Sequence, residues 1–154
     1  MNRISLVNRK IVRWSSMSTL NDFIRARTSR VASVEALTYQ NMTPLKVSSE
    51  QIQLEYKLNT ELDLNPMGNM HGGRMAYILD SVMSALASDF DKTDVNSLNF
   101  SVSYLNGISK DLDSFLVTAK IVKGGRAMAF LTAELSSKAG EIYTLSEGSF
   151  AKCA

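Results

Sequence analysis

Residues 65–80 read NPMGNMHGGRMAYILD, and two kinds of sequence meet inside this stretch. The first half is rich in turn-forming residues, with Pro66, three glycines and His71, which is the only histidine of the chain. The second half opens an apolar run that continues to residue 88, and from residue 76 onward Asp80 is its single charge. A tight loop followed by a long helix from about His71 to Ser88 is therefore predicted.

The composition of this helix decides the fold. A helix that is apolar or small on every side is enclosed by other elements rather than laid on a surface. Residues 51–62 alternate between apolar and polar side chains, which indicates a strand with one buried and one wet face. Four more strands are predicted at residues 97–104, 114–122, 127–136 and 142–150, with Gly124-Gly125 and Ala139-Gly140 at hairpin turns that need positive φ.

These elements are segregated along the chain, which is typical of the α+β class. We expect a curled antiparallel sheet of about six strands wrapped around the central helix, with a second copy of the chain burying what the sheet leaves open. A helix at residues 18–30 and a first strand at residues 34–39, ended near Pro44, complete the prediction.

The first residues differ from the rest in charge. Residues 1–16 carry four basic side chains and no acidic one, with apolar residues at near-helical spacing and several serines. This pattern predicts that residues 1–17 target the protein to the mitochondrial matrix and that residues 18–154 form a single domain. The alternatives are a disordered basic tail, or a cytosolic form that starts at Met17.

Composition argues against several classes of function. Removing the four basic residues of the leader from 17 leaves 13 against 15 acidic residues, so the body of the chain is not basic and nucleic-acid binding has little support. No apolar run approaches the roughly 20 residues of a membrane span. One cysteine, Cys153, and one histidine argue against an internal disulfide and against a metal site, so no metal cofactor is expected.

The loop at residues 65–73 is open to several interpretations. A Gly-Gly pair before a helix often serves backbone geometry alone. A phosphate-binding loop is poorly supported, because GNMHGGR lacks the lysine and the Ser or Thr of a Walker motif. A Ser-His-Asp triad would have to use His71, and no serine lies in a G-x-S-x-G pattern.

Acyl-transfer chemistry fits the loop better. A helix N-terminus presents unpaired N–H groups and partial positive charge, and glycine lets a ligand come close to the backbone. The N–H of Gly72 is thus a candidate donor to a carbonyl oxygen that becomes negative during acyl transfer. The amide of Asn65 is a candidate contact to the attacking water or to the thioester.

Asp80 is the candidate general base or nucleophile, because a carboxylate on an apolar helix is costly unless it has partners or a task. A carboxylate that merely hydrogen-bonds to backbone or serine is the alternative. His71 and Asp80 are nine residues apart, which places them half a revolution and roughly 13 Å apart on one helix. Two antiparallel copies of the helix could bring the two ends together, which predicts a composite site in a dimer.

The pattern N-x-x-G-x-x-H-G-G-x-x-A-x-x-x-D at residues 65–80 resembles the signature of hotdog-fold acyl-CoA thioesterases of the PaaI-like group. The resemblance continues through Ser97 and Tyr104, through KGGRAMAFLTAEL at residues 123–135 and through EGSFAK at residues 147–152. It covers roughly residues 20–152 and implies a hotdog fold with a role in fatty acid metabolism.

The resemblance also implies roles for individual residues. Asp80 would activate water or attack the thioester, Gly72 would hold the thioester oxygen, and Ser97 would position the water opposite Asp80. Asn65 would orient the carbonyl or water and His71 would brace the turn. Asn65, His71 and Gly72 would come from one subunit of a homodimer and Asp80 and Ser97 from the other, and two dimers could pair into a tetramer.

Coenzyme A enters as part of the substrate, so no separate cofactor is expected. The resemblance places Gly73 at the substrate, and Lys123 and Arg126 could meet the phosphates of coenzyme A; a solvated hairpin tip is the alternative for these two cations. Relatives often have an acidic residue near Asn99 and a proline near Gly107, and these two departures leave the acyl preference open.

Two other functions remain possible on the same fold. One is a module that binds acyl-CoA or lipid without hydrolysing it. The other is a hydratase or dehydratase that uses His71 as the acid/base partner of a carboxylate.

Overall fold

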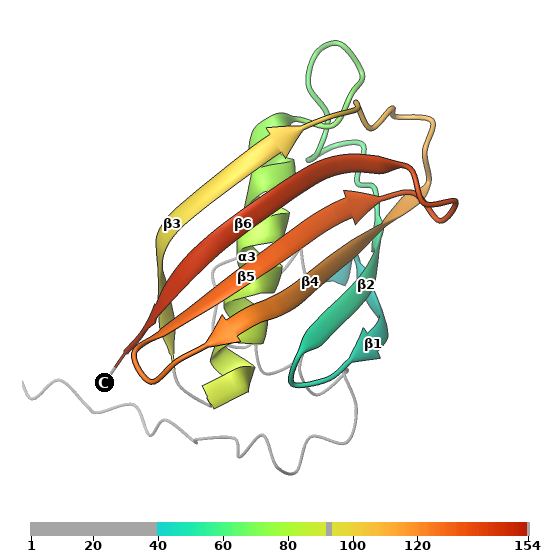
Figure 1. Cartoon of the computed structure of the whole chain (residues 1–154). Helices are drawn as coiled ribbons and strands as arrows, with labels where there is room; N and C mark the ends of the chain where they lie inside the picture. Colours follow the sequence, from blue (N-terminus) through green and yellow to red (C-terminus); the bar gives the residue numbers. More distant parts are fainter. Residues whose placement is uncertain (1–39, 92–93, 154) are drawn as a thin grey trace, which may run out of the picture.

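The computed structural model describes residues 40–91 and 94–153, which form six strands and one long helix (Figure 1). The elements are β1 (Met42–Val47), β2 (Gln51–Lys57), α3 (Gly72–Asp91), β3 (Val95–Tyr104), β4 (Ser114–Gly124), β5 (Met128–Ser136) and β6 (Ile142–Lys152). The predicted targeting segment, the helix at residues 18–30 and the strand at residues 34–39 lie outside the described residues. No helix in the described part is long and apolar enough to cross a membrane.

All neighbouring strands pair antiparallel, in the order β1-β2-β4-β5-β6-β3. The sheet is strongly twisted, and α3 lies along one of its faces (Figure 1). The prediction of an α+β fold with about six curled antiparallel strands and one central helix is thereby confirmed.

The core lies between the helix and the sheet. The alternation in β2 turns Ile52, Leu54 and Tyr56 toward the core, and none of them is more than 2% exposed. The helix contributes five fully buried large side chains, namely Ile78, Leu79, Val82, Met83 and Leu86. Burying one such side chain contributes about 1.5–3 kcal/mol, so this apolar contact fixes α3 against the sheet.

One stripe of α3 is left partly open. Gly73, Ala76, Tyr77, Asp80 and Ser84 are only half-buried or exposed, and they follow each other at helical spacing. Most of the other positions between residues 75 and 88 are buried. The helix is therefore enclosed on every side but one, and Asp80 lies on the open side.

Two details of the first strands differ from the prediction. The strand predicted over residues 51–62 ends at Lys57, because Asn59 turns the chain: its side-chain oxygen accepts hydrogen bonds from the N–H groups of Glu61 and Leu62.

Pro44 does not end a strand but lies inside β1, next to a bulge between Pro44 and Lys46. An edge strand tolerates proline because one of its sides needs no ladder hydrogen bonds.

The hairpin glycines also differ from each other. Gly140 has a positive φ of 92°, as expected for the β5–β6 turn, whereas neither Gly124 nor Gly125 does. The β4–β5 turn is closed instead by the N–H of Gly125, which donates to the carbonyl of Met128 at 2.7 Å.

Candidate active site

His71, the residue directly before α3, caps the first turn of the helix. Its carbonyl accepts from the N–H groups of Arg74 at 2.8 Å and Met75 at 3.1 Å, and its ring Nδ1 accepts from the N–H of Gly73 at 3.0 Å. An Nδ1 that accepts carries no proton, so the ring holds its proton on Nε2. The backbone N–H of His71 donates to the carbonyl of Asp63 at 2.7 Å, which ties the cap to the preceding loop.

One backbone N–H at the start of α3 makes no hydrogen bond within the described part of the chain. The N–H groups of His71, Gly73, Arg74 and Met75 are all used, whereas the N–H of Gly72 donates to no group within the described part of the chain. The helix holds the His71 carbonyl, and a trans peptide directs the next N–H the opposite way, out of the helix N-terminus. A free donor at the positive end of the helix dipole suits an oxygen that gains negative charge.

Tyr104, at the end of β3, stands beside Gly72. Its hydroxyl donates to the Gly72 carbonyl at 2.8 Å, and the side chain is half exposed. A Cβ built on Gly72 would lie 3.3 Å from Cζ of Tyr104, so the ring packs closely against a position that lacks a side chain. In the sequence Tyr104 stands out only as part of the family pattern, because no local sequence pattern relates residues 32 positions apart.

Asn65 organises the loop before the helix. Its side-chain oxygen accepts from the N–H groups of Met67 at 2.9 Å and Asn69 at 3.2 Å, and Gly68 between them has a positive φ of 78°. The amide nitrogen of Asn65 donates to no other group in the described residues. Only this nitrogen is therefore available to a ligand.

Asp80 has one side-chain partner in the described part of the chain. The hydroxyl of Ser97 donates to Oδ1 of Asp80 at 2.7 Å, across from β3 to the open stripe of α3. The ladder between β3 and β6 shifts register between Ser97 and Asn99, so a bulge lies directly after the serine. Bulges commonly redirect a side chain next to a functional site.

The two clusters are well separated within one chain. Gly72 and Asp80 are eight residues apart on one helix, which corresponds to roughly 12 Å of rise. Their partners on β3, Tyr104 and Ser97, lie seven residues apart on an extended strand, or roughly 23 Å. One chain therefore presents two half-sites near opposite ends of β3: the Gly72 half-site with Tyr104, and the Asp80 half-site with Ser97. A single chain does not bring Gly72 and Asp80 to the same substrate atom.

A buried ionic cluster underlies the Gly72 half-site, and sequence reasoning missed it. The carboxylate of Asp63 is fully buried and accepts from the Tyr56 hydroxyl, the Asn59 N–H and the Arg74 guanidinium, with the ion pair at 2.9 Å. The guanidinium also lies 5.3 Å from the ring centroid of Tyr77.

Burial, and then the Asp63 charge, raise the pKa of Tyr56 far above its usual value, so the phenol remains a proton donor. Burial alone would lower the pKa of Arg74, but the hydrogen bond and the charge of Asp63 outweigh this effect and raise it. Tyr56 therefore keeps its proton and Arg74 its charge across the pH range in which a hydrolase is assayed.

The predicted substrate-binding residues lie apart from this cluster. Lys123 and Arg126 are exposed at the β4–β5 turn and pair with no acidic side chain of the described residues. The amine of Lys152 donates to the carbonyl of Gly125, which brings a third cation to the same turn. Gly73 is exposed, but its N–H is already used by His71.

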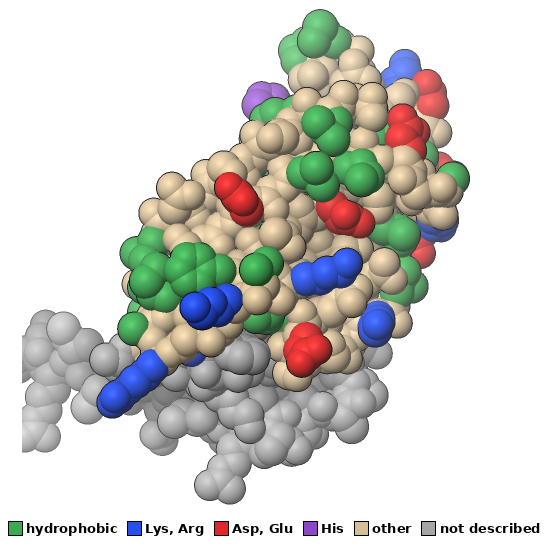
Figure 2. All heavy atoms as spheres, viewed as in Figure 1, with side chains coloured by type: hydrophobic (Ala, Val, Ile, Leu, Met, Phe, Trp, Pro, Cys, Tyr) green, Lys and Arg blue, Asp and Glu red, His purple; other side chains and the backbone are tan. Residues whose placement is uncertain are grey.

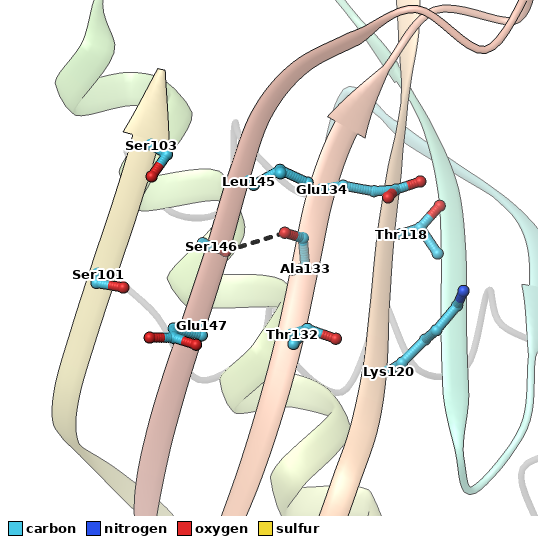
Figure 3. A pocket seen from close by; sticks show the side chains of 10 residues that line it. All are labelled: Ser101, Ser103, Thr118, Lys120, Thr132, Ala133, Glu134, Leu145, Ser146 and Glu147. Carbon is cyan, nitrogen blue, oxygen red and sulfur yellow. Dashed lines mark hydrogen bonds between the residues drawn. The ribbon is translucent and has the colours of Figure 1, made fainter. Parts of the chain in front are cut away.

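The face of the sheet turned away from α3 carries a separate hollow of about 490 Å³ (Figure 3). Hydroxyl groups line it together with Lys120, Glu134 and Glu147, and none of the predicted site residues takes part. Acidic and basic side chains are interspersed over this face rather than gathered into a field of one sign (Figure 2). In residues 40–91 and 94–153 no group of three His, Cys, Asp or Glu side chains could hold a metal ion.

Comparison with known proteins gives a consistent result. The model of the family "Thioesterase superfamily" matches residues 67–143, which is 77 of the 154 residues and includes His71, Gly72, Asp80 and Ser97. Acyl-coenzyme A thioesterase 13 of Mus musculus is 27% identical over 101 residues, which cover 64% of this chain and 70% of that protein.

Solved structures show the same architecture. Thioesterase superfamily member 2 of zebrafish superposes with a TM-score of 0.76 at 23% identity, covering 88% of this chain and 99% of that one. The mouse thioesterase superfamily member 2 gives a TM-score of 0.74 at 20% identity, covering 88% and 98%. The fold is therefore the hotdog fold, and the chain belongs to the thioesterase superfamily.

Proposed function

We propose that the protein hydrolyses acyl-CoA thioesters to a free carboxylic acid and coenzyme A. The observation that carries the proposal is the N–H of Gly72, the one donor of the first helical turn that the described residues leave unused. Family membership supports thioester hydrolysis in general. Coenzyme A as the acyl carrier is supported by the likeness to the mouse acyl-coenzyme A thioesterase 13. It is also supported by Lys123 and Arg126, which pair with no acidic side chain among the described residues.

The chemistry follows from the two half-sites. The Asp80 carboxylate takes a proton from water while the water oxygen attacks the thioester carbonyl carbon, and the carbonyl oxygen becomes an oxyanion that accepts from the Gly72 N–H. Collapse of this intermediate breaks the C–S bond, and the departing thiolate takes the proton from Asp80. In the alternative route the Asp80 carboxylate attacks the carbonyl carbon, the C–S bond breaks and coenzyme A leaves as the thiolate. Water then hydrolyses the mixed anhydride to the free acid and the Asp80 carboxylate, and the proton released protonates the thiolate.

Both routes require Gly72 and Asp80 at one carbonyl, which a single chain does not provide. Among the strands of residues 40–91 and 94–153, β3 pairs only with β6, and at ten residues it is a long edge strand. Antiparallel pairing of two β3 strands about a two-fold axis near Phe100 and Ser101 would place Ser97 of one copy opposite Tyr104 of the other. The Asp80 half-site of each chain would then face the Gly72 half-site of its partner.

Several exposed groups would be covered by this pairing. Leu98 is 57% exposed and Tyr104 53% exposed on β3, and a long edge strand with exposed apolar side chains invites pairing with another strand. The open stripe of α3 carries small residues next to Asp80, so a second chain could approach it closely. We therefore propose a homodimer with two composite sites; the pairing of dimers into tetramers stays a prediction.

The remaining predicted residues take roles that their contacts allow. The amide nitrogen of Asn65 can donate to the carbonyl or to water, since its oxygen is held by the loop. Ser97 orients Asp80 through the 2.7 Å hydrogen bond. His71 acts through the backbone as the helix cap, which is a positioning role.

The test is release of free thiol from medium- and long-chain acyl-CoAs by the purified full-length chain. Asp80→Ala should lower the rate on the order of 10²–10⁴-fold, the usual size of a general-base effect. Glu141→Ala, which removes an exposed carboxylate in the β5–β6 turn, is the matched control and should retain the wild-type rate. Wild-type activity in Asp80→Ala would refute the mechanism.

Two other outcomes separate the alternative functions. Binding of acyl-CoA by the wild-type protein without thiol release, even at high protein concentration, would favour a non-hydrolytic module. Hydration of an enoyl thioester that disappears in His71→Ala would favour a hydratase.

A further inference from the structure

Asp63 lies where three parts of the fold meet beneath the Gly72 half-site. Its carboxylate joins Tyr56 on β2, the N–H of Asn59 in the following turn and Arg74 on α3. Its carbonyl accepts the N–H of His71 at 2.7 Å. One fully buried residue thus connects the sheet, the loop and the start of the helix.

Arg74 is an unexpected residue at its position. A cation in the first turn of a helix is disfavoured by the helix dipole, and burial of a guanidinium adds to the cost. The side chain is only 18% exposed, and the Asp63 carboxylate meets it through both Nε and Nη2 at 2.9 Å. Because a buried cation is unfavourable at this position, stability of the helix alone does not account for the ion pair.

Asp63 and Arg74 are connected to Gly72 by backbone hydrogen bonds to the N–H and the carbonyl of His71. The Asp63 carbonyl fixes the N–H of His71, and the Arg74 N–H fixes the His71 carbonyl at 2.8 Å. The His71 carbonyl belongs to the same planar peptide as the Gly72 N–H. The direction of the Gly72 N–H is therefore set by a closed ring of contacts that runs through Asp63, His71 and Arg74.

We propose that Asp63 and Arg74 are a pair of positioning residues, which hold the His71–Gly72 peptide so that its N–H points at the thioester oxygen. The inference rests on the proposed function of Gly72 as the oxyanion donor. The pair acts on Gly72 through the backbone of His71, so loosening it should weaken stabilisation of the transition state more than binding of the substrate.

The test compares the wild type with the double variant Asp63→Asn, Arg74→Met in the thiol-release assay. Changing both residues avoids leaving one buried charge unpaired, so the double variant should fold. We expect kcat to fall on the order of 10–10²-fold with KM within about threefold, since a small misplacement of a catalytic donor has effects of this size. Arg74→Lys, which keeps the charge but loses the two-nitrogen contact, should lie between the wild type and the double variant.

A destabilised control separates positioning from stability. Ile52→Ala removes a buried side chain at the other end of β2 from Tyr56, and both variants are assayed well below their melting temperatures. The proposal is supported if kcat falls in the double variant and not in Ile52→Ala. It is overturned if the double variant keeps the wild-type kcat, or if Ile52→Ala loses as much.

The same experiment shows which proposal has failed. A wild-type protein that releases no thiol refutes the proposed hydrolysis and with it this inference. A wild-type protein that turns over normally beside an equally active double variant refutes the positioning role alone.

Discussion

The two half-sites on α3 are built by opposite means. Gly72 contributes a backbone N–H whose peptide is held through the His71 carbonyl by the N–H groups of Arg74 and Met75, while the Asp63 carbonyl and the Tyr104 hydroxyl hold the two flanking peptides. Asp80 contributes a side chain on a half-open stripe, with the Ser97 hydroxyl as its side-chain partner in the described residues.

This difference matches the task proposed for each group. A backbone donor has no rotamer to adjust, so the surrounding structure must aim it in advance, and preorganised donors are the ones that stabilise an oxyanion most. A carboxylate that takes up a proton and releases it needs one orienting hydrogen bond and room for water. The predicted effects of substitution should therefore be severe where the backbone donor is removed and graded where a contact merely orients a group.

After Asp80→Ala, the largest effect is expected at Gly72. Gly72→Pro deletes the N–H at the first helical position, where proline is tolerated, and should lower kcat on the order of 10²–10³-fold. Gly72→Ala is the matched control, because it adds a Cβ against the half-exposed Tyr104 ring and keeps the N–H. Its loss should stay below about tenfold. Equal rates for the two variants in the thiol-release assay would mean that the Gly72 N–H is not the oxyanion donor.

A smaller effect is expected at Ser97. Ser97→Ala removes the hydrogen bond that orients Asp80 and should lower kcat on the order of 10–10²-fold, because a hydrogen bond to a charged group contributes about 1.5–3 kcal/mol. Ser97→Thr keeps a hydroxyl and should retain most of the rate. A Ser97→Ala enzyme with the wild-type kcat would show that the 2.7 Å contact has no part in the reaction.

The smallest effect on rate is expected at His71. His71→Ala removes the Nδ1 acceptor from the helix cap and should lower the free energy of unfolding by about 0.5–2 kcal/mol. The thioesterase rate should change by less than about threefold, because the ring takes no part in proton transfer, whereas a general acid/base would lose about 10²-fold or more. His71→Asn, which can cap the same helix, should recover stability in thermal unfolding. A hundredfold loss of rate in both variants would assign His71 to the chemistry.

Much of the fold followed from local patterns in the sequence. The alternation at residues 51–57 and the apolar run after Gly73 indicated the strand and the helix, and the lone charge of Asp80 stood out on that helix. β1 was not anticipated, because proline at residue 44 was taken as the end of a strand. At the edge of a sheet proline is instead compatible with strand geometry.

The contacts that complete the site depend on how distant segments pack. Asp63 and Arg74 are 11 residues apart, and Tyr104 is 32 residues from Gly72, so no period of a helix or a strand relates them. Ser97 entered through the family resemblance and not through its own pattern. The contacts of Ser97 with Asp80 and of Tyr104 with Gly72 depend on how β3 packs along α3. No local pattern in a single sequence encodes this packing.

The composite site can be tested most directly by mixing two inactive variants, Gly72→Pro and Asp80→Ala. In a heterodimer of the two, one site would combine the intact Gly72 of one chain with the intact Asp80 of the other, and the second site would lack both. Random exchange of equal amounts should then restore about a quarter of the wild-type activity, because half of the dimers would carry one working site of two. Activity that stays at the mean of the two variants after verified subunit exchange would contradict a site shared between chains.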